Sequence, residues 1–352
     1  MNAGLWLYLT VLSVFVVFAI FSNALVIYCV VRFKKLRSVT NALICNLAVS
    51  DILLAGFVMP QRLHDITHVE DFFEGDVLCK MVNFTPVLII TTSIYTLVCV
   101  SFERKRAIQE THKQQMTFAA LYKIVPSLWL FGLLISLPTL LEYRVNHILV
   151  DEGNSTRIGL SCDSSHMEFS YSMTNAIFLV TVAYIVPVII MFKNYIEVAN
   201  FVWKKSKQIQ AATRAGKVHY QLFQHRIKVV KLLVVVATIF ALSWLPFFIT
   251  LLYAKITNND SSADASGFLN LFLLAMATFS TAYNVILYIV YNPSFNKAIK
   301  QVFHIRSGVS PELNNMATVQ GTRSEPMPEN SRVDEGQGKG VHIAHKNSGE
   351  DC

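Results

Sequence analysis

The chain has 352 residues, of which 53% are hydrophobic and only 15% are charged. Soluble proteins carry about 25% charged residues, so this composition excludes an ordinary soluble globular protein and predicts an integral membrane protein. The formal net charge of +7 does not indicate nucleic-acid binding, because the basic residues lie in short clusters between long apolar segments.

Seven apolar segments follow one another along the chain, and each is about as long as the ~20 residues that a helix needs to cross a bilayer. They cover approximately residues 5–31, 40–62, 77–108, 120–141, 170–202, 222–254 and 267–291. Continuous apolar runs indicate helices, whereas the strands of a membrane barrel would alternate apolar and polar residues. We therefore expect an all-α membrane protein with a seven-helix transmembrane bundle.

The first segment is expected to stay in the protein as a membrane anchor. No Lys or Arg precedes Arg32, so the basic start of a signal peptide is missing, and Asn23 interrupts the apolar run. A segment of only four residues precedes this first span.

Charges alternate in sign from loop to loop, which predicts the orientation. Basic residues gather at 32–37, 104–106 and 204–228, whereas residues 65–76 and 151–168 are rich in Asp and Glu. Because basic loops remain in the cytosol, we expect a multi-pass protein of the plasma membrane with an extracellular N-terminus and a cytoplasmic C-terminus.

Two of the six cysteines fall on the outer side of this topology. Cys79 and Cys162 lie where oxidation is permitted, so we expect a disulfide that joins the second outer loop to the third segment. The others lie inside expected spans or at the C-terminus: Cys29, Cys45, Cys99 and Cys352. Outer loops also contain glycosylation sequons at Asn154 and Asn259.

A short amphipathic eighth helix is expected over residues 294–304, after Pro293 ends the seventh segment. Its apolar face consists of Phe295, Ala298, Ile299, Val302 and Phe303. Such a helix lies on the inner membrane surface. The composition then shifts to Ser, Asn, Gly, Glu and Pro, so we expect a membrane domain at 1–305 and a disordered cytoplasmic tail at 306–352.

Polar side chains inside the spans are the candidate functional residues. A carboxylate at the bilayer centre costs about 2.5–3.5 kcal/mol on insertion scales, so Asp51 must face the bundle interior. Ser93 and Asn284 are its expected partners. Two interpretations remain open: a neutral structural residue, or a cation or proton site that is coupled to a change of state. We favour the second.

Two further patterns lie in the third and sixth segments. Glu103 and Arg104 can pair at the inner end of the third segment. The alternative is that these charged side chains simply extend from the helix end to the water, as is common. Pro246 permits a kink in the sixth segment, and Trp244 beside it could transmit ligand contact to that kink. Alone, each pattern is more typical of packing than of function.

Together these residues resemble the rhodopsin-like (class A) G-protein-coupled receptors over about residues 5–305. The matching motifs are Asn23, Leu47–Asp51 for LAxxD, the Cys79 and Cys162 pair, Glu103–Arg104 for (D/E)R, Trp129, Ser243–Pro246 for CWxP, Asn284–Tyr288 for NPxxY, and Phe295. The resemblance implies sodium binding by Asp51, Ser93 and Asn284. It implies an activation switch made of Pro187, Ile94, Phe240, Trp244 and Pro246. It implies G-protein coupling by Glu103, Arg104, Tyr195 and Tyr288.

Three residues depart from the family pattern at positions that control activation. Lys105 replaces the tyrosine after Arg104, and Val285 replaces the proline of NPxxY. Arg226 stands where the family often has an acidic partner for Arg104. Since two arginines repel each other, we expect a less restrained inactive state and measurable basal activity.

The expected ligand is a short peptide. The seventh segment has no lysine, which excludes a retinal Schiff base, and Pro86 occupies the position of the aspartate in amine receptors. Residues 72–80 are similar to the first outer loop of peptide receptors, and the chain most resembles the neuropeptide receptors. Acidic outer loops would attract a basic peptide. A lipid, amine or other small-molecule ligand stays open.

Ligand contacts are expected from Gln61, Asn83, Pro86, Asn175, Trp244, Phe247, Phe248 and Asn270. The resemblance implies a heterotrimeric G protein as partner, with arrestin and a receptor kinase acting on the tail, and no cofactor besides sodium. A transporter is disfavoured because no internal repeat is visible. An enzyme is disfavoured because the spans show no metal-ligand spacing and no nucleophile with a partner.

Overall fold

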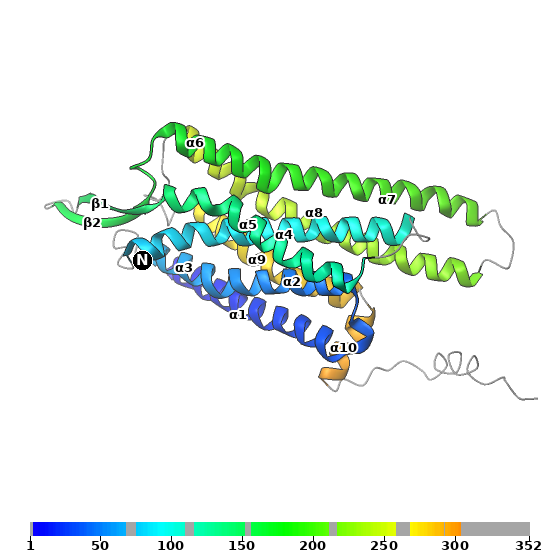
Figure 1. The fold of residues 1–352 in the computed structure, drawn as a ribbon. Helices are drawn as coiled ribbons and strands as arrows, with labels where there is room; N and C mark the ends of the chain where they lie inside the picture. The colour runs from blue at the N-terminus through cyan, green and yellow to red at the C-terminus, as the bar shows by residue number, and fades with distance from the viewer. Residues whose placement is uncertain are drawn as a thin grey trace, which may run out of the picture. The chain divides into compact units, whose positions relative to one another are not determined.

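The computed structural model describes residues 3–67, 75–109, 116–151, 156–210, 217–257, 268–291 and 293–303. This part of the chain is mostly helical (Figure 1). The helices are α1 (Ala3–Arg32), α2 (Val39–Leu53), α3 (Met59–Thr67), α4 (Gly75–Gln109), α5 (Phe118–Glu142), α6 (Phe169–Phe178), α7 (Val186–Gln210), α8 (Lys217–Ile256), α9 (Phe268–Tyr291) and α10 (Pro293–Val302).

The expected membrane helices are present. Six helical stretches in the described residues are long and apolar enough to cross a membrane: Gly4–Arg32, Val39–His64, Gly75–Gln109, Phe118–Glu142, Phe169–Lys205 and Leu233–Ile256. The seventh, α9, contains a shorter apolar stretch at Leu271–Tyr283. With 24 residues, α9 is about 36 Å long, enough for the ~30 Å hydrocarbon core.

The second and fifth spans are each interrupted by a π-helical segment, at Leu54–Val58 and Leu179–Ile185. Helix α2 therefore continues into α3, and α6 continues into α7. A π-turn inserts an extra residue into a helix, which rotates the residues beyond it, and such turns are frequent at functional sites.

Polar side chains join helices inside the bundle. Asn46 of α2 donates a hydrogen bond to Oγ1 of Thr96 on α4 at 2.9 Å, and its Oδ1 accepts one from Nε1 of Trp129 on α5 at 3.0 Å. Asn23 of α1 similarly donates to the carbonyl oxygen of Thr281 on α9 at 2.7 Å. Because lipid offers no such partners, these bonds favour the association of the helices.

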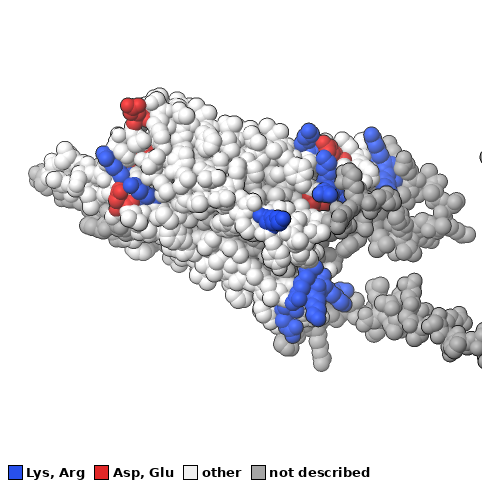
Figure 2. Space-filling model, in the orientation of Figure 1, with Lys and Arg blue, Asp and Glu red and all other residues white. Residues whose placement is uncertain are grey.

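The outer surface of the bundle is apolar. Exposed large apolar side chains include Leu7, Val14, Leu130, Leu134, Ile189, Ile196 and Ile249. Figure 2 shows that, on the visible face, charged side chains gather mainly toward the two ends and leave a broad uncharged band between them. This distribution matches a protein that crosses a bilayer.

An antiparallel hairpin, β1 (Arg144–Asp151) with β2 (Thr156–Asp163), joins α5 to α6 and was not predicted from the sequence. Its register pairs Val145 with Cys162. We call the end of the bundle that carries it the hairpin end, and the opposite end, toward which α4 runs, the Arg104 end (Figure 1).

Helix α10 lies where the amphipathic helix was expected. Phe295 and Ala298 are buried, whereas Lys297 is exposed. Its position on a membrane surface stays a prediction. The expected glycosylation sites Asn154 and Asn259 and the predicted tail at 306–352 lie outside the described residues.

Candidate functional site

A cavity of about 300 Å³ lies at the hairpin end, a volume within the range of small-ligand sites. Five helices, both π-helical segments, β2 and Tyr143 contribute to its lining. The π-turn of the second span contributes Leu54 and Val58, and that of the fifth contributes Leu179. The two π-turns therefore help to shape this cavity.

The apolar part of the wall is continuous with a chain of aromatic rings. Trp244 and Phe247 line the cavity, with ring centres 5.8 Å apart. Trp244 is next to Phe240, and Phe247 leads through Phe248 to Tyr184, whose ring stacks on Phe248 at 4.7 Å. These contacts connect the cavity to the core of α8 and to the fifth span.

The expected switch residues lie in this region. Ile94, Phe240 and Trp244 belong to one buried apolar cluster, and Pro187 is buried in α7. Pro246 lies within α8 and leaves the carbonyl of the preceding turn without its helical donor. The indole Nε1 of Trp244 has no hydrogen-bond partner in the described part of the chain.

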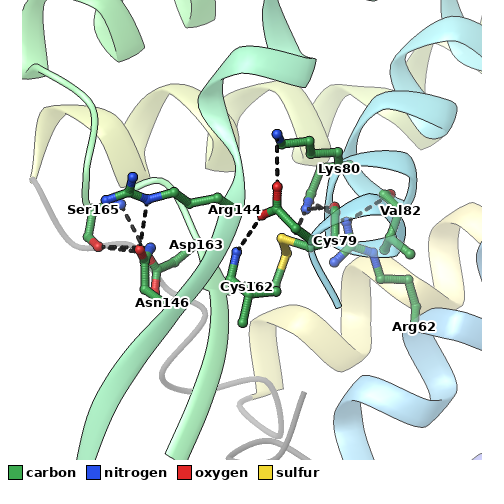
Figure 3. Close-up of a disulfide and its surroundings, with 12 residues drawn as sticks. Arg62, Cys79, Lys80, Val82, Arg144, Asn146, Cys162, Asp163 and Ser165 are labelled. Carbon is green, nitrogen blue, oxygen red and sulfur yellow. Dashed lines mark hydrogen bonds and ion pairs between the residues drawn. A yellow bond between two sulfur atoms is a disulfide. The ribbon is translucent and has the colours of Figure 1, made fainter. Parts of the chain in front are cut away.

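A disulfide at the hairpin end joins Cys79 of α4 to Cys162 of β2, as expected (Figure 3). Asn83, one turn along α4, donates to the carbonyl oxygen of Cys79 at 3.0 Å and to Sγ of Cys162 at 3.4 Å. Its Oδ1 accepts a hydrogen bond from Arg62 of α3 at 3.0 Å. Arg62, Asn83 and Cys162 all line the cavity, so the disulfide that holds the hairpin is also part of the cavity wall.

Asp163 fixes the end of the hairpin beside the cavity. Burial raises the pKa of its carboxyl group, but hydrogen bonds from the Ser165 hydroxyl and amide and from Asn146 outweigh burial, so the net pKa lies below its usual value. Asp163 is therefore an anion at neutral pH. The amide of Val145 also donates to Asp76 of α4 at 3.1 Å, which gives the hairpin a second attachment.

A buried ion pair, missed from the sequence, lies in the cavity wall. Nζ of Lys255 on α8 is 2.9 Å from Oε1 of Glu142 on α5. Ser164 accepts a hydrogen bond from Lys255 at 2.6 Å, and Asn175 donates one to Glu142 at 2.6 Å. Glu142 and Lys255 each stand at the end of an expected span, where a charged residue is ordinary; no sequence signal pairs them.

The expected ligand contacts fall into three groups. Asn83, Pro86, Trp244 and Phe247 line the cavity. Gln61, Asn175 and Phe248 are not part of its lining: Phe248 packs on Tyr184, and Asn175 is bonded to Glu142. The side chain of Asn270 lies outside the described residues.

At the Arg104 end, Glu103 of α4 contacts both α2 and the adjacent Arg104. Its Oε2 accepts hydrogen bonds from Oγ1 of Thr40 on α2 at 2.7 Å and from Nε of Arg104 at 2.6 Å. Lys105, the departure from the family pattern, forms an ion pair with Glu197 of α7. The lysine therefore joins α4 to α7.

Tyr195, also expected at the coupling surface, is buried on α7, and its hydroxyl has no partner in the described part of the chain. The side chains of Tyr288 and Arg226 lie outside the described residues.

The expected cation site is buried in mid-bundle. Asp51 is 3% exposed and Ser93 is 2% exposed, on the packed helices α2 and α4. A carboxylate and a hydroxyl are oxygen donors of the kind that hard cations prefer, so these residues fit a sodium ion. The side chain of Asn284 lies outside the described residues.

Comparisons with known proteins agree with this architecture. Residues 22–288 match the family model described as 7 transmembrane receptor (rhodopsin family). The neuromedin-K receptor of Oryctolagus cuniculus is 30% identical over 295 residues, which are 83% of this chain and 60% of that receptor. The pyroglutamylated RF-amide peptide receptor of Rattus norvegicus is 26% identical over 291 residues, 79% of this chain and 65% of the relative. The substance-P receptor of Aquarana catesbeiana is 26% identical over 300 residues, 84% and 71% of the two chains. The neuromedin-K receptors are thus matched over only about 60% to 68% of their length.

Proposed function

Because this chain belongs to the rhodopsin family of seven-transmembrane receptors, we propose that it is a plasma-membrane receptor that binds a short peptide and activates a heterotrimeric G protein. The observation that carries the proposal is the cavity at the hairpin end. Its wall combines an aromatic part, Trp244 and Phe247, with charged residues of both signs. A peptide offers both apolar side chains and polar groups to such a wall, whereas a purely apolar ligand would offer the charged residues no polar group.

The names of the relatives support a peptide. The three relatives are called receptors for neuromedin K, for a pyroglutamylated RF-amide peptide and for substance P. The hairpin end would then face the outside of the cell and the Arg104 end the cytosol, as the loop charges indicate.

Activation would proceed along α8. A ligand that contacts Trp244 and Phe247 more favourably in one state than in the other shifts the equilibrium by that difference in affinity. Pro246 lets α8 bend beside this contact. Outward movement of the inner end of α8 would then release Arg104 and Tyr288, at the opposite end, to the G protein.

Two further partners belong to the proposal. Asp51 and Ser93 would hold a sodium ion in the inactive state. Serine and threonine residues of the tail would receive phosphate from a receptor kinase and dock arrestin. The tail candidates are Ser307, Ser310, Thr318, Thr322 and Ser324.

A peptide screen in cells that carry a promiscuous G protein tests this function. We expect at least one short peptide to trigger signalling in cells with the wild-type chain. The matched control is Arg104→Ala at equal surface expression, which should bind the same peptide without signalling. Silence to every peptide together with a response to a lipid or an amine would contradict the peptide assignment.

A further inference from the structure

The Glu142–Lys255 ion pair is a buried contact between two helices in the cavity wall. Glu142 is the last residue of α5 and is 3% exposed; Lys255 lies in the last turn of α8 and is 6% exposed. Nζ of Lys255 lies 2.9 Å from Oε1 of Glu142. The activation route described above does not use this pair, although both residues line the cavity.

The helix ends stabilise one of the two charges and destabilise the other, because both Glu142 and Lys255 lie at helix C-termini. That end of a helix carries partial negative charge, which favours a cation and disfavours an anion. Lys255 is therefore stabilised by its own helix, by the acceptor Ser164 and by the ring of Tyr143, whose centre is 5.5 Å from Nζ. Glu142 is opposed by its own helix, so its carboxylate requires a cation.

Acceptor atoms beside Glu142 are left without donors. Among the described residues, Oε1 of Glu142 lies 2.9 Å from the ammonium group but accepts no hydrogen bond of regular geometry. Oγ1 of Thr139, one turn earlier on α5 and also in the cavity lining, has no partner in the described part of the chain either. Buried acceptors without donors are unfavourable, and a group with several N–H donors would satisfy them.

We propose that Glu142 is the cation site of the ligand cavity, where a guanidinium or ammonium group of the ligand replaces Lys255. This proposal rests on the proposed receptor function. It adds a positive charge on the ligand and names Glu142 as the residue that binds that charge. Displacement of Lys255 separates the hairpin end of α8 from α5, and α8 is the helix that contains Trp244 and Pro246. An anionic group would instead take Lys255 and leave Glu142 buried without a cation.

Direct binding of three related probes tests the site: the N-acetyl phenethylamides of arginine, citrulline and glutamate. The arginine and citrulline probes have nearly the same shape and differ in charge, and the phenyl ring suits the aromatic wall. Dissociation constants are measured by ligand-observed NMR on the purified full-length protein. Wild type should bind the arginine probe more tightly than the citrulline probe.

Two single variants should act in opposite directions. Lys255→Met removes the resident competitor and should strengthen binding of the arginine probe about tenfold or more. Glu142→Gln should weaken that binding about tenfold or more and leave the citrulline probe unchanged. If the single variants fail to fold, the double variant, which removes both charges together, is used. It should bind the arginine and citrulline probes equally.

Three results would overturn the proposal: equal binding of arginine and citrulline by wild type, tightest binding of glutamate that Lys255→Met abolishes, or retained arginine preference in the double variant. No G protein enters the measurement, so a chain that fails to signal would still give an answer. A chain that signals to peptides but binds all three probes equally would keep its proposed function and lose this site.

Discussion

Asn46 shows how one polar side chain can hold a membrane bundle together. Its amide nitrogen donates to Thr96 and its amide oxygen accepts from Trp129, so one residue uses both halves of its amide group to join three helices. Asn46 and Thr96 are buried and Trp129 is half-buried, so the hydrophobic region offers few other partners to replace a lost one. The residue is therefore a structural centre of the bundle.

We expect Asn46→Ala to destabilise the protein by about 1–3 kcal/mol, because it leaves the indole N–H of the half-buried Trp129 without its acceptor. The melting temperature of the purified protein measures this loss. Trp129→Phe removes the donor itself, so the double variant should cost less than the two single losses together. Strictly additive losses would show that the hydrogen bond contributes nothing.

Asp51 supplies a second prediction at the residue scale. If Asp51 and Ser93 hold sodium, sodium chloride should raise the melting temperature of the wild-type protein more than the chloride of a large organic cation does, because binding to the folded state stabilises it. Asp51→Asn removes the charge and should abolish that difference. An equal response to sodium in both proteins would place the ion elsewhere.

At the scale of whole elements, α4 and α5 approach each other closely at Gly132. A Cβ atom at this position would lie 2.5 Å from Oγ1 of Thr92 and 3.2 Å from the backbone oxygen of Leu88. A methyl group there would force the Thr92 side chain to move and would press against the backbone of α4 at Leu88. Small residues of this kind let membrane helices pack backbone to backbone.

Gly132→Ala should therefore destabilise the protein by about 1–3 kcal/mol through overpacking. Gly56→Ala is the matched control, since its added Cβ would meet only Cδ1 of Ile20, at an ordinary 3.8 Å. Thermal unfolding of the two variants side by side provides the measurement. Equal melting temperatures for both would mean that the α4–α5 contact tolerates a methyl group.

The helices themselves could be predicted from the sequence, because long apolar runs have few alternatives in a bilayer. The hairpin could not, since residues 144–163 lie outside the membrane and show no regular alternation. The Glu142–Lys255 pair could not be predicted either, because the two residues are far apart in the chain and meet only through the packing of α5 and α8. Four of the eight expected ligand contacts line the cavity. Asn175 and Phe248 are buried but contact Glu142 and Tyr184 instead, and the sequence does not show which neighbour a buried side chain meets.

For the whole molecule, the distribution of charge predicts the orientation in the membrane. The loops at the Arg104 end are basic, and they should remain in the cytosol. The hairpin should then be reachable from outside the cell, where its disulfide is also stable.

A cysteine introduced at exposed Ile158 of the hairpin should react with a membrane-impermeant thiol reagent on intact cells. A cysteine at exposed Arg106, at the other end, should react only after the cells are permeabilised. Mass spectrometry or gel shift reports the labelling. The reverse pattern would invert the topology and, with it, the sides assigned to ligand and G protein.

The disulfide at the hairpin end has a consequence for the chemistry outside the cell. Asn83 contacts the sulfur of Cys162, positions Arg62 and lines the cavity. Opening the disulfide would remove one of the contacts that orient Asn83 and would loosen the arginine that it holds. We therefore expect reduction of the disulfide to change the ligand preference of the proposed site through a single amide side chain.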